Sequence, residues 1–170
     1  MICFGHGQME GLQFVLLSSK ILVIGIYLHQ EDEFMKTENW PHKWFGIWRE
    51  IGPSYYTCPS IYGWVDREEV KSYGDDLPKI INYLRTSTVI VTTSAMGFPN
   101  IISGQRKRES SISYRTDGTW VWFDDLAEYI ELNNVALPRD FYEHMKKQSF
   151  ISPDASKINP DDLDWPSSLK

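Results

Sequence analysis

An Asp-Gly pair, Asp117-Gly118, is the sequence feature that most constrains what this chain can fold into. It separates two short stretches that alternate in character, residues 111–115 and residues 119–123. Asp-Gly favours a tight turn whose two central residues have positive φ, and alternation at period two is typical of strands. The sequence therefore predicts a β-hairpin over about residues 111–123. Because side chains alternate along a strand, Trp120 and Trp122 are expected on one face and Val121 on the other.

Helical and extended patterns flank this hairpin. Apolar residues at i, i+3, i+4 and i+7 predict a helix over residues 77–84, with Asp76 as its cap. Residues 88–93, TVIVTT, are β-branched throughout and predict a strand covered on both faces. Two further helices are expected after the hairpin, one ending at Asn133-Asn134 and one beginning at Pro138. We predict an α+β fold, with an antiparallel sheet and helices packed on one of its faces.

Three tryptophans, Trp40, Trp44 and Trp48, are spaced four residues apart. On a helix this spacing would place them on one face, although Gly46 would weaken the helix in its middle. Such a stripe is expected to pack in the core. The functional alternative is an aromatic platform for a base, a sugar or a partner protein.

The chain divides into three parts by composition. Residues 14–28 are apolar but interrupted by Lys20, and they are too short for a membrane-spanning helix. They are either buried strands or part of an upstream extension, and we favour residues 1–34 as an extension outside the core. Residues 35–151 are then a single globular domain. Residues 152–170, rich in Pro, Asp, Ser and Asn, are expected to be a mostly irregular tail.

Charge and cysteine content restrict the function. The formal net charge is −6 and the pI is about 5.2, which argues against binding nucleic acid through its phosphates. The short basic run Arg106, Lys107 and Arg108 is interpreted as a solvated loop. Cys3 and Cys58 form neither a disulfide framework nor a zinc motif, and the histidines lack metal-ligand spacing. We expect no metal, no cofactor, no stable membrane insertion and a reducing, cytoplasmic location.

No group of residues in the sequence has the spacing of a catalytic site. The enzymatic alternatives would use Cys58 with His144, or the carboxylates of Asp75 and Asp76, but adjacent carboxylates at a helix start are usually caps. We therefore predict no catalytic residues.

A partner-binding surface is predicted at four neighbouring residues, Trp64, Asp66, Glu68 and Glu69. An aromatic side chain beside carboxylates is common in tight interfaces. The alternative is a solvated acidic turn over a buried tryptophan.

Several motifs together resemble a family of small bacterial proteins. They are W-P-H-K-W from Trp40, P-S-I from Pro59, T-D-G-x-W-x-W from Thr116, L-x-x-Y-I from Leu126 and L-P-x-x-F from Leu137. The resemblance covers about residues 38–148 and departs from the pattern at Phe123, where many relatives carry proline. These proteins resemble the immunity proteins of polymorphic-toxin and contact-dependent inhibition systems.

The resemblance implies an acidic, cytosolic, single-domain protein that is catalytically silent and binds a cognate toxin. Two other classes stay open on the residues alone: a small intracellular enzyme, and a structural or assembly protein. A toxin gene beside this one would favour the first class, and a metabolic operon would favour the enzyme.

Overall fold

The computed structural model describes residues 40–105 and 111–167 of the 170-residue chain. The interpretation of residues 1–34 as an extension lies outside the described residues, as does that of the basic run at residues 106–108.

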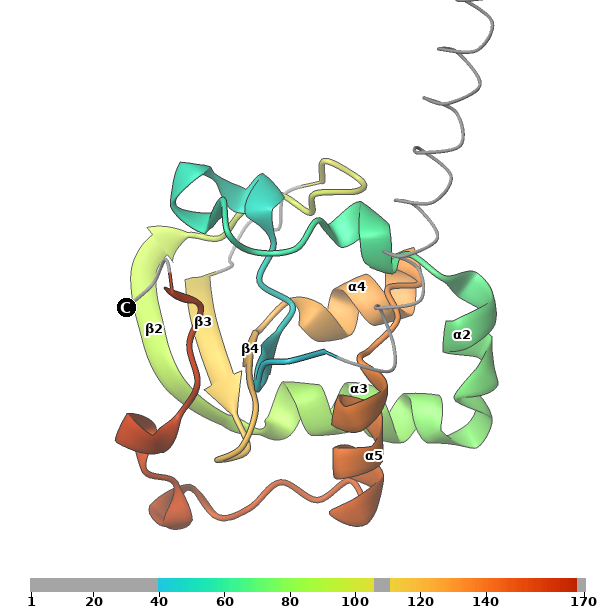
Figure 1. Ribbon diagram of the computed structural model, residues 1–170, viewed down its shortest axis with the longest axis vertical. Coiled ribbons are helices and arrows are strands. Elements are labelled where there is room, and N and C mark those ends of the chain that lie inside the picture. Colours follow the sequence, from blue (N-terminus) through green and yellow to red (C-terminus); the bar gives the residue numbers. More distant parts are fainter. Residues whose placement is uncertain (1–39, 106–110, 168–170) are drawn as a thin grey trace, which may run out of the picture. The chain divides into compact units, whose positions relative to one another are not determined.

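A four-stranded sheet forms the centre of the fold (Figure 1). Its strands are β1 (Trp44–Phe45), β2 (Thr88–Met96), β3 (Ser111–Thr116) and β4 (Val121–Phe123), in the spatial order β1-β4-β3-β2. Strands β2, β3 and β4 are antiparallel neighbours, whereas β1 pairs with β4 in parallel. The predicted α+β class is confirmed, with a sheet that is mixed because of the two-residue strand β1.

The predicted hairpin is strands β3 and β4 with a connection over residues 117–120. Gly118 has a φ of +87°, as the Asp-Gly pair predicts, but Asp117 does not have positive φ. The loop is longer than a two-residue turn because the Asp117 carboxylate organises it. Its Oδ1 accepts hydrogen bonds from the backbone N–H groups of Thr119 at 2.8 Å and Trp120 at 2.7 Å.

The described residues form four α-helices beside the sheet: α2 (Arg67–Ser72), α3 (Leu77–Thr86), α4 (Leu126–Asn133) and α5 (Arg139–Lys147). The three helices predicted from the sequence are confirmed as α3, α4 and α5. Helix α4 ends at Asn134, which has the left-handed conformation expected there. Asp76 precedes α3 but its side chain does not cap the helix. It accepts hydrogen bonds from Lys79 at 2.8 Å and from the Tyr142 hydroxyl at 2.9 Å instead.

Helices α3, α4 and α5 pack on one face of the sheet, as predicted. Trp120 and Trp122 both point into this layer, and Trp120 stacks on Phe141 with ring centroids 4.3 Å apart. The indole N–H of Trp122 donates to the carbonyl of Leu84 at 3.2 Å, which satisfies its one polar group. Alternation along residues 120–122 thus places both tryptophans towards the helices.

The opposite face of the sheet is covered by irregular chain. Its buried residues are Trp44, Ile47, Cys58, Tyr114, Val121, Phe123 and Leu163. Residues 152–167 contain only two short 3-10 turns, yet Leu163 is buried and the Trp165 ring lies 5.2 Å from that of Tyr114. The end of the described chain therefore runs against the sheet beside β3 (Figure 1).

Two local predictions are wrong. Trp40, Trp44 and Trp48 are not on one helical face, because Trp44 lies in β1 and Gly46 then bends the chain with a φ of +75°. A Cβ at Gly46 would lie 3.0 Å from the Leu126 side chain, so this close approach requires glycine. Trp44 and Trp48 are still buried in the core, and the partly buried Trp40 packs against it.

The prediction that residues 88–93 are covered on both faces is also wrong. They belong to β2, which is an edge strand, and Val89 and Val91 are both exposed. The β-branched composition reflects the extended conformation and not complete burial.

Candidate protein-binding surface

The partner-binding residues predicted from sequence lie at and just before the start of helix α2, and Trp64 ends the preceding 3-10 turn. Trp64 is only 4% exposed and packs edge-on against Phe45, with ring centroids 4.6 Å apart. The Asp66 carboxylate caps the helix by accepting from the backbone N–H groups of Glu68 and Glu69, each at 3.0 Å. The Glu68 carboxylate pairs with Lys71. A buried Trp64 offers no ring to a partner, so the arrangement is that of an acidic turn over a core tryptophan.

The residues considered for catalysis lie in separate places. Cys58 is buried in the cluster on the irregular face of the sheet, whereas His144 is on helix α5. Nε2 of His144 lies 3.1 Å from Oδ2 of Asp117. The Asp76 carboxylate is held by Lys79 and Tyr142, as described above. The structure does not bring Cys58, His144 and Asp76 together.

Asp117 is the most enclosed carboxylate that the structure describes, and its environment is structural. Oδ2 accepts from the Tyr83 hydroxyl at 2.8 Å, and Oδ1 accepts the two backbone N–H groups of its own loop. Burial alone would raise its pKa, but the contacts with His144, the loop N–H groups and Tyr83 outweigh burial and lower the pKa. The carboxylate is therefore held ionised by the groups that fix the hairpin.

An exposed loop over residues 97–105 is shaped by one buried side chain, that of Asn100. Its Oδ1 accepts from the backbone N–H groups of Ile102 at 3.0 Å and Ser103 at 2.9 Å. Its Nδ2 donates to Asn133 at 2.9 Å on helix α4. Nδ2 also donates to Glu128 at 3.4 Å, and the Tyr129 hydroxyl accepts from the N–H of Ile101 at 3.0 Å, so three residues of α4 hold this loop.

A concave surface, here called the aromatic groove, lies on one side of this loop. Its cavity volume is about 370 Å³. It is lined by Glu50, Ile51, Tyr62, Phe98, Pro99, Asn100, Ile101 and Gly104. The Glu50 carboxylate is positioned by the hydroxyl of Ser60 and by the N–H of Ile61, which donates at 3.2 Å.

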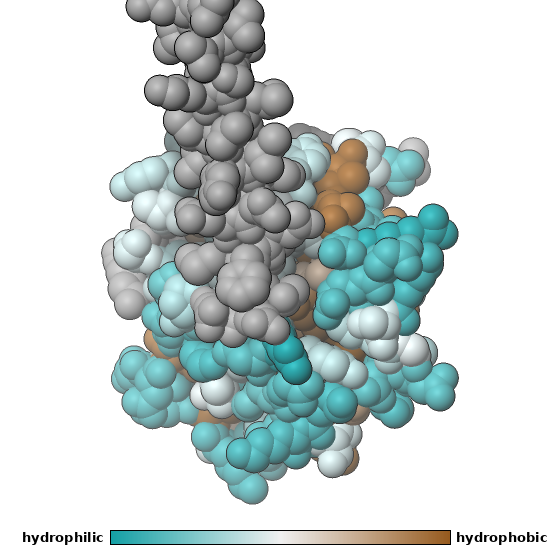
Figure 2. Space-filling view, turned by 45° about the vertical axis from the view of Figure 1, so that its right-hand side comes forward, coloured by the Kyte–Doolittle hydropathy of each residue, from teal (hydrophilic) through white to brown (hydrophobic). Residues whose placement is uncertain are grey.

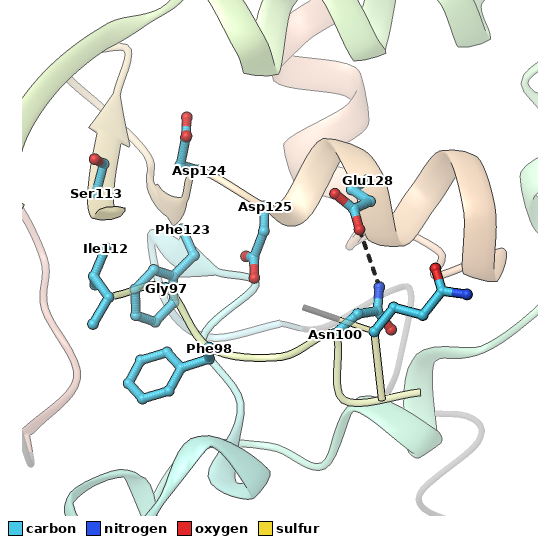
Figure 3. A pocket seen from close by; sticks show the side chains of 10 residues that line it. Gly97, Phe98, Asn100, Ile112, Ser113, Phe123, Asp124, Asp125 and Glu128 are labelled. Atoms are coloured by element: carbon cyan, nitrogen blue, oxygen red, sulfur yellow. Dashed lines mark hydrogen bonds between the residues drawn. The ribbon is translucent and has the colours of Figure 1, made fainter. Parts of the chain in front are cut away.

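A smaller cavity of about 70 Å³, here called the acidic pocket, lies next to the aromatic groove and shares Phe98 and Asn100 with it. Its polar side is formed by Asp124, Asp125 and Glu128 at the start of α4 (Figure 3). Asp125 points towards the loop, whereas Asp124 points away from it (Figure 3) and binds Arg115.

Exposed aromatic side chains gather around the aromatic groove. Tyr62 is 60% exposed and Phe98 is 37% exposed, and both line the groove. The Tyr55 and Phe98 rings are 6.4 Å apart, which brings the turn at residues 53–56 close to the loop. An aromatic surface with carboxylates at its edge is suited to contact with a protein.

The sequence patterns do not predict this surface. Gly97-Phe98-Pro99-Asn100 indicates a turn, but nothing in it shows that Phe98 stays exposed. The groove combines residues 50–62 with residues 98–104, and only the folded chain brings these segments together.

Among the described residues, no helix is both long and apolar enough to cross a membrane, and no group of three or more His, Cys, Asp or Glu side chains could hold a metal ion. Comparison of the chain with known protein families, characterised proteins and solved structures gave no match.

Proposed function

We propose that this chain is a non-catalytic binding protein of the immunity type, which neutralises a cognate toxin domain by covering part of its surface. The observation that carries the proposal is the aromatic groove, a concave surface whose lining includes the exposed rings of Tyr62 and Phe98. Tyrosine gives large contact area at low entropic cost and is enriched at the centres of tight interfaces.

The charge of the chain indicates the chemistry of this partner. Glu50 lines the aromatic groove, and Asp125 and Glu128 line the adjoining pocket. The whole chain carries a net charge of −6. These carboxylates would attract a basic protein surface and accelerate its association. A nuclease-like toxin domain would present such a surface.

The separation of Cys58 from His144 supports a binding function over an enzyme that uses these two residues, because a nucleophile and its base must lie within hydrogen-bond reach. Figure 2 shows hydrophilic residues over most of the visible described surface, with apolar residues in small patches.

The experiment is co-expression of the full chain with the product of the adjacent gene. We expect the two proteins to co-purify as a complex, and the chain to protect cells from growth arrest by that product. A chain that neither co-purifies nor protects would contradict the proposal. Turnover of a metabolite of the same operon by the purified chain would favour the enzymatic alternative.

A further inference from the structure

The aromatic groove contains one negative charge in an otherwise uncharged lining. Among the described residues that line it, Glu50 alone carries a charge. The remaining lining side chains are mostly apolar, chiefly those of Ile51, Tyr62, Phe98 and Ile101. A group that complements this lining must combine a positive charge with an apolar body, as long basic side chains do.

The Glu50 carboxylate is held in place by residues 60–61. Its Oε1 accepts a hydrogen bond from the Ser60 hydroxyl, and its Oε2 accepts from the N–H of Ile61 at 3.2 Å. A carboxylate can accept about four hydrogen bonds, so each oxygen keeps the capacity for a further donor. The two parallel N–H groups of a guanidinium match a pair of carboxylate oxygens held in this way.

Arg49, the neighbour of Glu50 in the chain, does not use this capacity fully. Its Nε lies 3.6 Å from Oε1 of Glu50, which is longer than the roughly 2.7–2.9 Å of a charge-assisted hydrogen bond. The Arg49 side chain is 58% exposed, so solvent screens this ion pair. A second guanidinium at hydrogen-bond distance would therefore interact with Glu50 more strongly than Arg49 does.

Two aromatic side chains of the groove provide surfaces for a planar cation. The Tyr62 hydroxyl donates to the carbonyl of Ile101 at 3.5 Å, which links the two segments that form the groove. Tyr62 and Phe98 are both exposed, so their rings are accessible to a partner. Arginine stacks on aromatic rings and is more weakly hydrated than the lysine ammonium. The lining thus favours arginine over lysine.

We propose that the aromatic groove binds an arginine side chain of the protein partner, an inference that rests on the proposed binding function of the same surface. The guanidinium pairs with the Glu50 carboxylate, and the apolar stem lies against Tyr62 and Phe98. The groove volume of about 370 Å³ is near the lower end of the roughly 300–1,000 Å³ of small-ligand pockets, so it suits one side chain better than a helix. The net charge of −6 favours a partner that is basic around this arginine.

The proposal is tested with short peptides, which need no knowledge of the partner. The probes are acetylated and amidated Gly-Arg-Gly, the same peptide with citrulline, which has nearly the shape of arginine but no charge, and the same peptide with lysine. Each is titrated into the isotope-labelled full chain and followed by NMR. We expect the arginine peptide to bind about tenfold more tightly than the citrulline peptide and more tightly than the lysine peptide. The resonances that shift should be those of residues 50–51, 62 and 98–104.

Glu50→Gln should remove most of the preference for arginine over citrulline, because it removes the charge and keeps the size of the side chain. Glu143→Gln is the matched control, since Glu143 is exposed on helix α5 and outside the groove lining. It should keep the preference. Tyr62→Ala covers the case in which Glu50→Gln does not fold, and it should weaken binding of the arginine peptide about threefold or more.

Equal binding of the arginine and citrulline peptides to the wild type would overturn the proposal, as would equal binding of the arginine and lysine peptides. A preference that survives in both folded Glu50→Gln and Tyr62→Ala, or that is lost equally in Glu143→Gln, would also overturn it. Co-purification decides the proposed function separately. A chain that co-purifies with the adjacent gene product but does not prefer the arginine peptide keeps the proposed function and contradicts the arginine site. A chain that prefers the arginine peptide but neither co-purifies nor protects supports the site and contradicts the proposed function.

Discussion

The Tyr83 hydroxyl donates a hydrogen bond of 2.8 Å to Oδ2 of Asp117, which joins helix α3 to the hairpin loop. His144 on α5 contacts the same oxygen at 3.1 Å. One buried carboxylate in the Asp-Gly turn thus connects the hairpin with two of the helices that pack on the sheet. The first prediction tests this connection.

Asp117→Asn should remove part of the acid sensitivity of the fold. The folded-state pKa of Asp117 lies below its ordinary value, so its ionised form stabilises the fold above about pH 4, and this contribution is lost as pH falls through the folded-state pKa. Wild type should lose more free energy of unfolding between pH 7 and pH 3 than the variant, as measured by urea unfolding. Asp154→Asn is the control: the pKa of Asp154 is also lowered, by hydrogen bonds with Ser156, but that group is solvent-exposed, so this variant should lose less of the wild-type pH dependence than Asp117→Asn does. Identical slopes for wild type and Asp117→Asn would contradict the prediction.

Gly118→Val should destabilise the hairpin by about 1–3 kcal/mol, because the backbone holds a φ of +87° that a β-branched residue resists. The Cβ itself meets only the Ile158 side chain at 3.4 Å, so conformational strain is the dominant cost. Gly118→Asn fills similar space but tolerates positive φ, and it should lose less stability. Thermal unfolding compares the three proteins, and equal melting of wild type and Gly118→Val would refute the assignment of strain to this turn.

Leu163→Ala should cost about 2–4 kcal/mol of unfolding free energy, since it removes a buried side chain from the cluster with Tyr114 and Val121. Ile151→Ala, at an exposed position in the preceding segment, should change stability by less than about 0.5 kcal/mol. Chemical denaturation measures both. A loss for Leu163→Ala as small as that for Ile151→Ala would mean that residues 152–167 do not stabilise the sheet.

A chain comprising residues 35–170 should unfold cooperatively, with stability close to that of the full chain. The two described core clusters and the side chains packed on them come from residues 40–165. Calorimetry of the full and shortened chains tests this. Loss of a cooperative transition in the shorter chain would place the apolar residues 14–28 in the core.

Tyr62→Ala and Phe98→Ala should each weaken binding of the proposed toxin partner by about tenfold or more, the effect of removing an aromatic anchor from an interface centre. Both side chains are exposed, so unfolding free energy should change little. Leu132→Ala, on helix α4 and outside the groove, should bind as wild type does. Calorimetric titration with the partner measures all three, and undiminished affinity in both groove variants would exclude the groove as the contact surface.

Local features of the sequence determined the hairpin and helices α3, α4 and α5. They also determined the face of the sheet on which each side chain of β4 lies. These features depend on short-range physics: the positive φ of Gly118, the period of apolar residues, and the alternation of side chains along a strand. Such preferences act within a few residues, so they can be predicted without knowledge of the fold.

Only the tertiary structure decided which pieces became neighbours. The spacing of Trp40, Trp44 and Trp48 is typical of a helix. In the folded chain Gly46 packs closely against Leu126, and the segment forms a short strand followed by a bend. The aromatic groove and the exposed edge of β2 are likewise set by which segments pack together in the fold. Whether Phe98 or Val91 is covered depends on segments far away in sequence, because burial is a property of the packed chain and not of the residue.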